Sequence, residues 1–310
     1  MGKVAFLFAG QGAQYPGMGE KLYMTSPAAK RIMDALEAVR PGTLEMCFRG
    51  EAEALTQTIN TQPCLFAVDL ACAAAGVEAG LKADCAAGFS LGELCAVSFS
   101  GMLTMEETFG LVLRRAEWMQ ACNESHPGAM LAVLKLTAEQ VEVICAQVEG
   151  AYPVNYNSPG QTVVACNAAL TNDITSRVSQ AGGRCLPLKV GGSFHTPVMR
   201  PATEGLAKLL ADMKVEVPSL PVYANRTAGL YTVAAAKELL SSQASHPVRW
   251  QQTIEAMWVD GVDTFIEFGP GTTLAGLVKR TVSGAKIASI SDPESLEKCL
   301  KMLAAGGAEA

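Results

Sequence analysis

The sequence is poor in charge, and this shortage limits what the protein can be. Only 17% of its 310 residues are charged, and the formal net charge is −6. A chain without an excess of cations lacks what contacts to a phosphate backbone require, which argues against a nucleic-acid-binding protein. No apolar stretch approaches the length of a membrane span, so we expect no membrane segment.

Paired cysteines and clustered histidines are also missing. Ten cysteines are present, but no two are spaced as C-x-x-C, and several, such as Cys72 and Cys95, lie in apolar runs. We interpret them as reduced core cysteines of a cytosolic protein rather than a disulfide framework. The three histidines are scattered along the chain. We therefore expect no metal site and no permanently bound cofactor.

Apolar residues, by contrast, are plentiful, at 49% of the chain. A chain of this length and composition can form one large domain, or a large domain with a smaller insert. The N-terminal run "VAFLFA" is short, and no A-x-A cleavage pattern follows it. We therefore expect a buried first strand there rather than a signal peptide.

Short apolar runs alternate with helical patterns along most of the chain. Strands are expected at "KVAFLFAG" and "CAAGFS", whereas "PVYANRTAG", "VDTFIEFGPG" and "KIASIS" are each expected to be a short strand followed by a turn or a helix start. Thr104 and Glu107 form an S/T-x-x-E capping box that opens a helix running to about Met119. This alternation predicts an α/β layer fold with a mainly parallel sheet, which we expect to be a large α/β-hydrolase-like domain.

The stretch from 126 to 192 has a different order of elements. Its patterns read β-α-β-β-α-β, with strands such as "AMLAVL", "YPVNYNS" and "QTVVACN". This is the order of a ferredoxin-like module. We therefore predict a large domain made of residues 1–125 and 193–310, and a small ferredoxin-like insert of residues 126–192.

One motif places a serine between two glycines at the joint of a predicted strand and helix. Gly88, Ser90 and Gly92 match G-x-S-x-G. In a nucleophile elbow the glycines give room where the backbone crosses closely, and the serine hydroxyl stands at the helix N-terminus. The alternative is a tight turn in which Ser90 only caps the helix.

A serine hydroxyl is a weak nucleophile unless a base activates it. His126 and His246 each precede a proline in loop-like stretches, where we expect exposed residues, whereas His195 lies in "GGSFHTPVM" after a strand and two glycines. We interpret His195 as the base; the alternative is a histidine without a catalytic part. Because 115 residues follow it, the order does not suit a hydrolase triad. We expect a dyad whose imidazole is oriented by a carbonyl or an amide.

Acyl chemistry also needs donors for an oxyanion. The N–H of Leu91, next to the predicted nucleophile, is one candidate. The loop "AGQGAQ" after the first strand offers the N–H of Gln11 as a second. The alternative for this loop is a phosphate-binding or purely structural turn, although it lacks the G-x-x-x-x-G-K pattern.

Arg115 lies in a predicted helix without a local counter-ion. Its neighbours three and four positions away are all apolar: Leu111, Val112, Trp118 and Met119. An arginine on an apolar face needs a distant carboxylate or an anionic ligand, because an unpaired buried charge is costly. A clamp on a substrate carboxylate and a structural role, as an ion pair or a snorkelling side chain, both remain open.

Together these pieces resemble the malonyl-CoA:acyl carrier protein transacylase family, which includes polyketide acyltransferase domains. The resemblance runs almost from end to end and in order. The segments that carry it are "FLFAGQGAQYPGMG", "GFSLGE", the Arg115 helix, "NYNSPGQTVVA", "SFHTPVM", "HPVRW" and "EFGPGTTLAGLVKR". Any one of them is modest support, but the ordered set is specific.

The resemblance implies roles for the matching positions. Ser90 would carry the acyl group, and His195 would serve as its base and later as an acid. Gln11 and Leu91 would form the oxyanion hole. Arg115 would clamp the free carboxylate of a malonyl group, which decides between the two readings above in favour of a ligand.

The resemblance also implies substrate-binding positions around this centre. Asn155 and Asn157 would lie near the site in the insert. Phe194 resembles the residue of malonyl-selective members, where its bulk leaves little room for an α-methyl group. Arg249 stands where the family often has a glutamine whose backbone carbonyl orients the histidine, so only a backbone role carries over. The family's usual histidine inside the elbow is Phe89 here, which puts strict selectivity for malonyl in question.

We therefore expect an acyltransferase that moves malonyl from malonyl-CoA to the phosphopantetheine thiol of an acyl carrier protein through an acyl-serine, in fatty acid or polyketide synthesis. The alternatives are an editing thioesterase on the same fold and a non-enzymatic carrier-docking subunit. An acidic carrier requires a local basic patch. Candidates for this patch are Lys189, Arg200, Lys279 and Arg280, with ordinary surface solubility as the other reading. We expect a cytosolic monomer.

Overall fold

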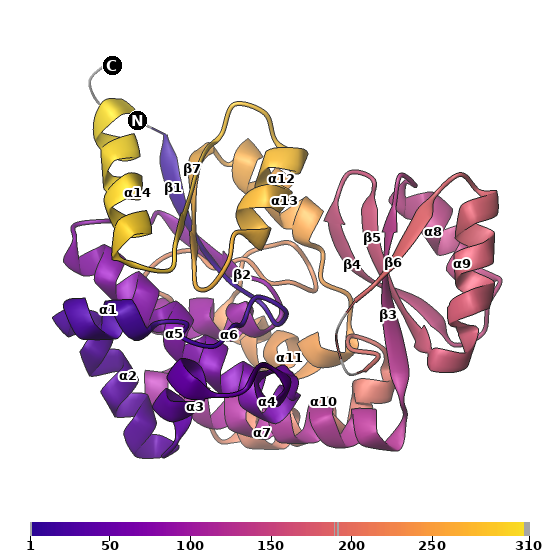
Figure 1. The fold of residues 1–310 in the computed structure, drawn as a ribbon, viewed down its shortest axis with the longest axis horizontal. Coiled ribbons are helices and arrows are strands. Elements are labelled where there is room, and N and C mark those ends of the chain that lie inside the picture. The colour runs from indigo at the N-terminus through magenta and orange to yellow at the C-terminus, as the bar shows by residue number, and fades with distance from the viewer. Residues whose placement is uncertain (1, 189, 191, 307–310) are drawn as a thin grey trace.

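Strands and helices alternate along the described chain, which comprises residues 2–188, 190 and 192–306 of the computed structural model (Figure 1). The strands are β1 (Lys3–Phe8), β2 (Cys85–Gly88), β3 (Gly128–Leu134), β4 (Ala151–Ser158), β5 (Gln161–Asn167), β6 (Arg184–Pro187), β7 (Val262–Phe268) and β8 (Lys286–Ile290).

Along the chain, helices lie before, within and after the insert. In chain order they are α1 (Glu20–Thr25), α2 (Pro27–Val39), α3 (Thr43–Arg49), α4 (Ala52–Thr56), α5 (Thr58–Glu78), α6 (Leu91–Phe99), α7 (Met105–Ser125), α8 (Ala138–Ala146), α9 (Thr171–Gln180), α10 (Arg200–Ala211), α11 (Val233–Ser242), α12 (Trp250–Val259), α13 (Thr273–Thr281) and α14 (Pro293–Gly306). Short 3₁₀ helices are η1 (Ala168–Leu170), η2 (Pro197–Met199) and η3 (Gln243–Ser245).

A parallel sheet with the strand order β2-β1-β7-β8 forms the centre of the larger part. Strands β1, β2 and β7 are largely buried on both faces, as is typical of parallel sheets, whereas most of the edge strand β8 is half-buried. Successive side chains of β1 point to opposite faces. Phe6 and Phe8 enter one core, and Ala5 and Leu7 enter the other. The predicted α/β arrangement with a parallel sheet is therefore confirmed.

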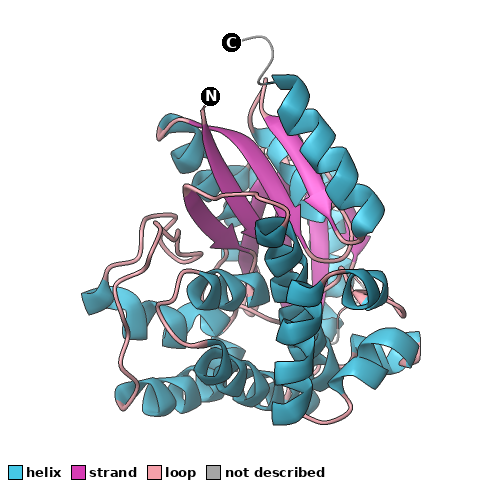
Figure 2. Ribbon diagram, turned by 90° about the vertical axis from the view of Figure 1, so that its left-hand side faces the viewer, coloured by secondary structure: helices cyan, strands magenta, loops and turns pink. Residues whose placement is uncertain are grey.

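Helices cover both faces of this sheet (Figure 2). The face of Phe6 and Phe8 packs against α2, α5, α6 and α7, and the opposite face packs against α12 and α13. Helix α5 is buried over most of its circumference, which explains why its sequence is apolar nearly all round. The parallel strands thus end together at one edge, and the loops after β1 and β2 meet there.

A second, antiparallel sheet has the strand order β4-β5-β3-β6 and lies on the right of Figure 1. One face packs against α8 and α9 through Leu131, Val164 and other apolar residues. The other face packs against α7 and the segment around Phe194. The order of elements predicted for residues 126–192 is confirmed.

Backbone hydrogen bonds tie the second sheet to the larger part. The Tyr156 N–H donates to the Val248 carbonyl at 2.9 Å, and the Val248 N–H donates to the Val154 carbonyl at 2.8 Å. The segment before α12 thereby extends the edge of β4. This pairing fixes where Asn155 and its neighbours stand relative to the strands of the parallel sheet.

The structure differs from the sequence-based expectations at two places. In the stretch 221–229 the predicted turn is present, but the short strand before it is reduced: Val222 makes one parallel bridge to Ala86, and the chain then turns away, with Ala228 at a φ of 55°. The turn follows because the polar groups of Asn225 bond to other elements. The predicted capping box of Thr104 is confirmed, but α7 continues past Met119 to Ser125.

All ten cysteines are free, and all except the half-buried Cys185 are buried, as the sequence predicts. Within the described residues, no helix combines the length and the apolar character needed to cross a membrane. In the same part of the chain, no group of three or more His, Cys, Asp or Glu side chains is placed to hold a metal ion.

Candidate active site

Ser90 stands between β2 and α6 in a strained backbone conformation. Its φ is 53° and its ψ is −97°, a region that L-residues rarely adopt. A Cβ added to Gly88 would lie 1.9 Å from the Gly92 carbonyl, and one added to Gly92 would lie 2.2 Å from the Phe8 carbonyl oxygen. The two glycines therefore let the turn pack against β1. The Ser90 side chain makes no capping hydrogen bond, so the alternative of a simple helix cap is wrong.

Asn225 holds this turn in place, and sequence reasoning missed it. The Ser90 N–H donates to Asn225 Oδ1 at 2.7 Å, and Asn225 Nδ2 donates to the Gly88 carbonyl at 2.7 Å. The Asn225 N–H donates to Glu93 Oε1 at 2.8 Å. One side chain thus satisfies the buried N–H of the strained residue and the carbonyl two positions before it. Its position just after a predicted strand was the available signal.

His195 lies within hydrogen-bonding distance of the serine. Its Nε2 is 2.9 Å from Ser90 Oγ, and its Nδ1 is 3.0 Å from each of two backbone carbonyls, those of Gln243 and His246. Carbonyl oxygens only accept, so Nδ1 carries the proton and Nε2 is free to accept one from the hydroxyl. The imidazole is therefore oriented by backbone carbonyls rather than by a carboxylate.

Burial keeps this imidazole neutral. Burial first, and the nearby Arg115 cation second, lower the pKa of His195 to about 4. A neutral ring at pH 7 is the form that accepts a proton. The side chain is only 5% exposed, which also keeps bulk water away from Nε2.

Arg249 does not take the backbone role that the resemblance implied, because its carbonyl is used elsewhere. This carbonyl accepts from the Thr253 N–H at 3.0 Å, at the start of α12, and the Arg249 N–H donates to the Asn225 carbonyl at 2.9 Å. The guanidinium lies 5.8 Å from the centre of the Tyr156 ring. The residues that hold Nδ1 of His195 come earlier in the chain, in η3 and just after it.

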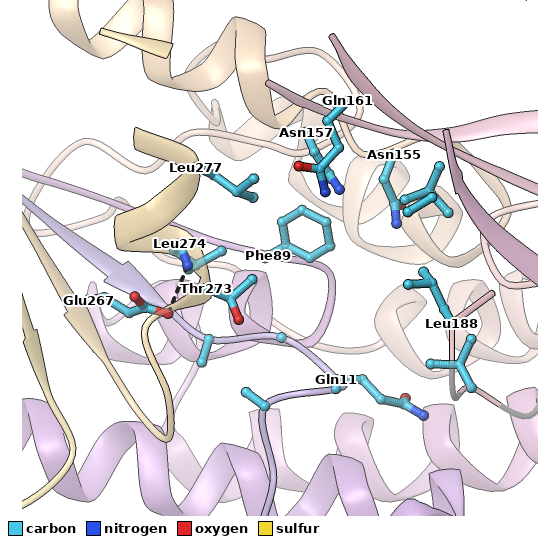
Figure 3. Close-up of a pocket in the computed structure, with 17 residues that line it drawn as sticks. Gln11, Phe89, Asn155, Asn157, Gln161, Leu188, Glu267, Thr273, Leu274 and Leu277 are labelled. Carbon is cyan, nitrogen blue, oxygen red and sulfur yellow. Dashed lines mark hydrogen bonds between the residues drawn. The ribbon is translucent and has the colours of Figure 1, made fainter. Parts of the chain in front are cut away.

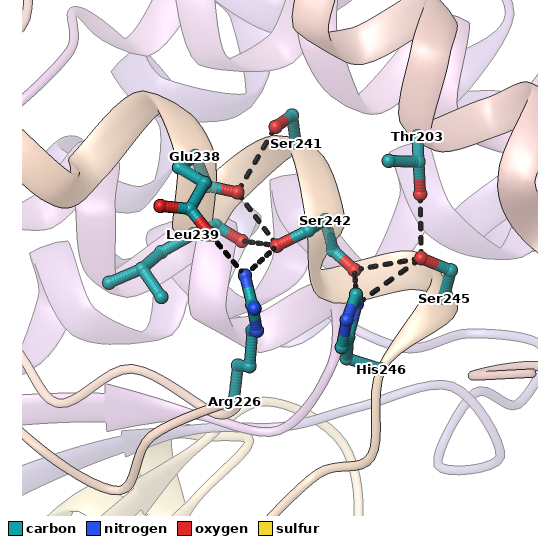
Figure 4. A network of polar contacts seen from close by, with 8 residues as sticks. All are labelled: Thr203, Arg226, Glu238, Leu239, Ser241, Ser242, Ser245 and His246. Carbon is teal, nitrogen blue, oxygen red and sulfur yellow. Dashed lines mark hydrogen bonds and ion pairs between the residues drawn. The ribbon is translucent and has the colours of Figure 1, made fainter.

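A network of polar contacts fixes the turn that carries these two carbonyls (Figure 4). The His246 Nδ1 donates to the Ser242 carbonyl at 2.8 Å, and Ser245 Oγ donates to the same carbonyl at 3.2 Å. Arg226 Nη1 donates to Ser242 Oγ at 3.0 Å. His246 is therefore not the exposed loop residue that the sequence suggested, whereas His126 is exposed. Three side chains, those of His246, Ser245 and Arg226, thus hold the turn, and the two carbonyls that accept from His195 have fixed positions.

Arg115 reaches the nucleophile from α7. Its side chain is 1% exposed, its Nη2 donates to Ser90 Oγ at 3.1 Å, and its Nε donates to Gln243 Oε1 at 3.1 Å. Its Nη1 has no partner among the described residues. Burial lowers the pKa of Arg115 to about 10, so it remains a cation at neutral pH. A buried cation with an unpartnered donor beside the serine can bind an anionic group of a substrate.

Gln243 and Glu93 surround this arginine, and neither was singled out from the sequence. Gln243 Nε2 donates to Glu93 Oε2 at 2.8 Å and to the Ser90 carbonyl at 3.0 Å. Glu93 Oε1 also accepts from Tyr231 at 2.6 Å. Burial raises the pKa of Glu93 to about 7. The signal available for Glu93 was its place in "GFSLGE"; Gln243 carried none.

A cavity of about 290 Å³ opens beside the serine turn, between β4 and the loop after β1 (Figure 3). Its walls include Gln11, Phe89, Asn155 and Asn157. The Oδ1 atoms of both buried asparagines have no partner among the described residues. Phe89 packs edge-on against Trp250 with ring centres 5.5 Å apart. The cavity thus combines apolar walls with two amide side chains, each of which has a buried oxygen without a partner among the described residues.

The remaining predicted positions lie around this centre. Leu91 is the first residue of α6, and the first N–H groups of a helix lack an intrahelical acceptor. The Gln11 side chain donates to Thr58 Oγ1 at 3.4 Å. Phe194 is buried in the core beneath the small sheet. Of the predicted basic patch, Lys279, Arg280 and Arg200 are exposed, and Lys189 lies outside the described residues.

The fold and this site define an acyltransferase. The acyl transferase domain family matches residues 5–296. A malonyl CoA-acyl carrier protein transacylase of Bacillus subtilis is 38% identical over 98% of both chains. The one from Escherichia coli K12 is 32% identical over 97% of this chain and 100% of its own length. The chain belongs to the malonyl CoA-acyl carrier protein transacylase family.

Solved structures agree with this assignment. The crystal structure of a malonyl CoA-acyl carrier protein transacylase from Clostridium perfringens has a TM-score of 0.94 and 34% identity, over 99% of this chain and 98% of that one. A malonyl-transacylase in complex with its type II polyketide synthase acyl carrier protein has a TM-score of 0.92 and 32% identity, over 96% of this chain and 99% of that one.

Proposed function

We propose that the protein transfers a malonyl group from malonyl-CoA to the phosphopantetheine thiol of an acyl carrier protein, with Ser90 as the acyl carrier in between. The single observation that carries this proposal is the buried Arg115 guanidinium, 3.1 Å from Ser90 Oγ and with Nη1 unpartnered among the described residues. A cation at this place suits an acyl group that ends in a carboxylate. The relatives named above support the same substrate and acceptor.

In the first half-reaction, His195 Nε2 removes the proton from Ser90 Oγ while Oγ attacks the thioester carbon. The C–S bond then breaks, and the proton on Nε2 passes to the departing CoA sulfur. The products are malonyl-Ser90 and CoA, and His195 is neutral again. The 2.9 Å contact and the two carbonyls on Nδ1 support this assignment.

The charge that develops on the thioester oxygen needs donors. We assign this role to the backbone N–H groups of Leu91 and Gln11. Leu91 opens α6, where the helix dipole favours a negative charge. Gln11 belongs to the loop after β1, which lines the same cavity.

The second half-reaction repeats these steps in reverse order. Nε2 of His195 takes the proton of the incoming phosphopantetheine thiol, whose sulfur attacks the malonyl-Ser90 ester. The ester C–O bond breaks, and Ser90 Oγ regains the proton from Nε2. At this stage a transferase reacts quickly with the thiol acceptor and slowly with water. This difference distinguishes it from the alternative, an editing thioesterase.

Selection of the acyl group follows from the side chains around Ser90. Arg115 would pair with the malonyl carboxylate, and Phe194 would leave little room for an α-methyl group. Asn155 and Asn157, with their unpartnered amide oxygens among the described residues, would bind polar groups of the thioester arm. Phe89, in place of a histidine, adds an apolar wall to the cavity.

The test is intact-protein mass spectrometry after mixing with equimolar acetyl-, malonyl- and methylmalonyl-CoA. The proposal predicts a malonyl adduct on the wild type and none on Ser90→Ala. Arg115→Ala should lose malonyl transfer by about a hundredfold, since a buried charged contact contributes roughly 2–5 kcal/mol, and lose acetyl transfer far less. Equal losses would contradict the clamp. Free CoA without an adduct would favour the thioesterase.

The same proposal includes the division of the chain into two domains and the cellular compartment of the protein. Residues 1–125 and 193–310 form the α/β-hydrolase-like domain, and residues 126–192 form the ferredoxin-like insert; the two sheets support this division. The ten free cysteines support a reducing, cytosolic setting. The exposed Arg200, Lys279 and Arg280 are proposed to meet an acidic carrier. The monomeric state stays a prediction.

A further inference from the structure

The side-chain amide of Gln243 has a fixed direction. Its oxygen accepts from Arg115 Nε at 3.1 Å and also from Arg115 Nη2. Its nitrogen donates to Glu93 Oε2 at 2.8 Å and to the Ser90 carbonyl at 3.0 Å. A reversed amide would set a donor against the guanidinium and an acceptor against two acceptors. The partners on both sides therefore determine one orientation.

Glu93 supplies part of this directionality, as the side-chain acceptor for the amide nitrogen of Gln243. One of its oxygens is occupied by the Asn225 N–H at 2.8 Å and the Tyr231 hydroxyl at 2.6 Å. The other accepts from Gln243. Glu93 is 1% exposed and Gln243 is 2% exposed, so water does not compete for these bonds.

The consequence lies in the guanidinium itself. Along one edge of the guanidinium, Nε and Nη2 both donate to the amide oxygen of Gln243. Nη2 also donates to Ser90 Oγ, whereas Nη1 remains without a partner among the described residues. The plane of the guanidinium and the identity of its free nitrogen therefore depend on the amide oxygen of Gln243. A guanidinium binds a carboxylate well only when its fork is presented in a fixed geometry.

We propose that Glu93, acting through the side-chain amide of Gln243, is a positioning residue that orients Arg115 and thereby sets the preference of the enzyme for a malonyl group over an uncharged acyl group. This inference rests on the proposed function, in which Arg115 binds the malonyl carboxylate. Gln243 has a second, separate contact, because its backbone carbonyl accepts from Nδ1 of His195. Changes to its side chain leave that carbonyl in place.

The test compares Glu93→Gln with the wild type. The new amide keeps its oxygen on the Asn225 N–H and the Tyr231 hydroxyl, so its nitrogen faces the amide nitrogen of Gln243. Two donors then oppose each other, and Gln243 must turn or shift, which removes the acceptor from Arg115. We expect the ratio of kcat/KM for malonyl-CoA to that for acetyl-CoA to fall about tenfold or more. The reason is that the buried donors of Gln243 and Arg115 lose their acceptors, which is energetically costly.

A second variant and a matched control separate positioning from folding. Gln243→Leu removes the amide but keeps the backbone carbonyl, and we expect the same fall in the ratio. Tyr231→Phe removes a different hydrogen bond to Glu93 without touching Gln243, and we expect the ratio to stay within about twofold of the wild type. Labelling of Ser90 by an uncharged fluorophosphonate ester does not need the carboxylate clamp, and it should stay within about threefold of the wild type in Glu93→Gln and Tyr231→Phe.

The outcomes distinguish this inference from the proposed function. A ratio that is unchanged in a folded Glu93→Gln or Gln243→Leu protein overturns the inference, and so does a fall matched by an equal loss of fluorophosphonate labelling or shared by Tyr231→Phe. Arg115→Ala is measured in the same series. If it keeps the malonyl preference, the proposed function fails; if it loses the preference while Glu93→Gln retains it, only the positioning role fails.

Discussion

Ser90 and His195 meet at 2.9 Å with both backbones at positive φ, 53° and 62°. Few non-glycine residues in the described chain share this feature; they are Ser90, Lys135, His195 and Ala228. A backbone conformation of this kind costs on the order of 1–3 kcal/mol per residue. Both members of the proposed dyad are thus held in place by surrounding structure against their own conformational preference.

Relief of the strain at Ser90 should stabilise the fold. Ser90→Gly places a residue that tolerates positive φ in the elbow and keeps the backbone N–H that bonds Asn225. We expect its free energy of unfolding to exceed that of Ser90→Ala by about 1 kcal/mol, as measured by urea denaturation. Both variants should lose acylation by a factor on the order of 10⁴ or more. A glycine variant no more stable than the alanine variant would show that the elbow is unstrained.

The pH dependence of acylation should reflect the depressed pKa of His195. Its value of about 4 means that the ring is already neutral well below its ordinary pKa of 6.5. The rate of Ser90 labelling by the uncharged fluorophosphonate should therefore rise with pH through about 4 and be level near pH 6. Stopped-flow or quenched labelling across this range is the measurement. A midpoint near 6.5 would mean that the ring is solvated in the working enzyme.

The buried Glu93 should make the protein less stable as the pH rises from acid toward neutral. Its pKa is raised from 4.5 to about 7 in the folded state, so the folded protein holds a proton that the unfolded chain releases between these values. The stability that this proton contributes is complete below about pH 4.5 and is lost as the pH rises through 7.

Glu93→Gln removes this titration. As the pH rises from 4.5 to 7, the wild type should therefore lose unfolding free energy relative to the variant, so the variant is relatively more stable at the upper end. The depressed pKa of His195 acts in the opposite sense and is common to both proteins, so it cancels in the difference. Arg115, Tyr231 and Gln243 face Glu93 and are also common to both. A difference that does not vary with pH would contradict a raised pKa.

Asn225 should be essential to the elbow. Asn225→Ala leaves the Ser90 N–H and the Gly88 carbonyl buried without their partner. We expect a loss of about 2–4 kcal/mol in stability, since each unsatisfied buried group costs roughly 1–3 kcal/mol, together with a large loss of Ser90 labelling. Asn167→Ala, at an exposed helix cap, is the control and should cost about 1 kcal/mol with no effect on labelling. Equal effects of the two changes would contradict the role of Asn225.

Much of the fold was readable from local patterns. The strands at β1, β2, β7 and β8 and the order of elements in the insert follow from apolar runs and their spacing, and the capping box of Thr104 follows from its two partner residues. In the stretch 221–229 the predicted turn is present, but the short strand before it is reduced to one bridge to β2 at Val222, because the contacts of Asn225 to the elbow turn the chain away. No local pattern contains the information that Asn225 has partners more than a hundred positions distant.

The sequence by itself indicated the elbow, because two glycines around a serine after a buried strand allow the backbone to cross closely, and it marked His195 and Arg115 as polar groups in need of partners. Tertiary structure alone decided which groups hold them. His195 is oriented by the carbonyls of Gln243 and His246, and every residue carries such a carbonyl, so no letter of the sequence marks these two. Arg115 meets Gln243 across 128 positions. Only the packing of α7 against η3 and the serine turn brings those groups within bonding distance.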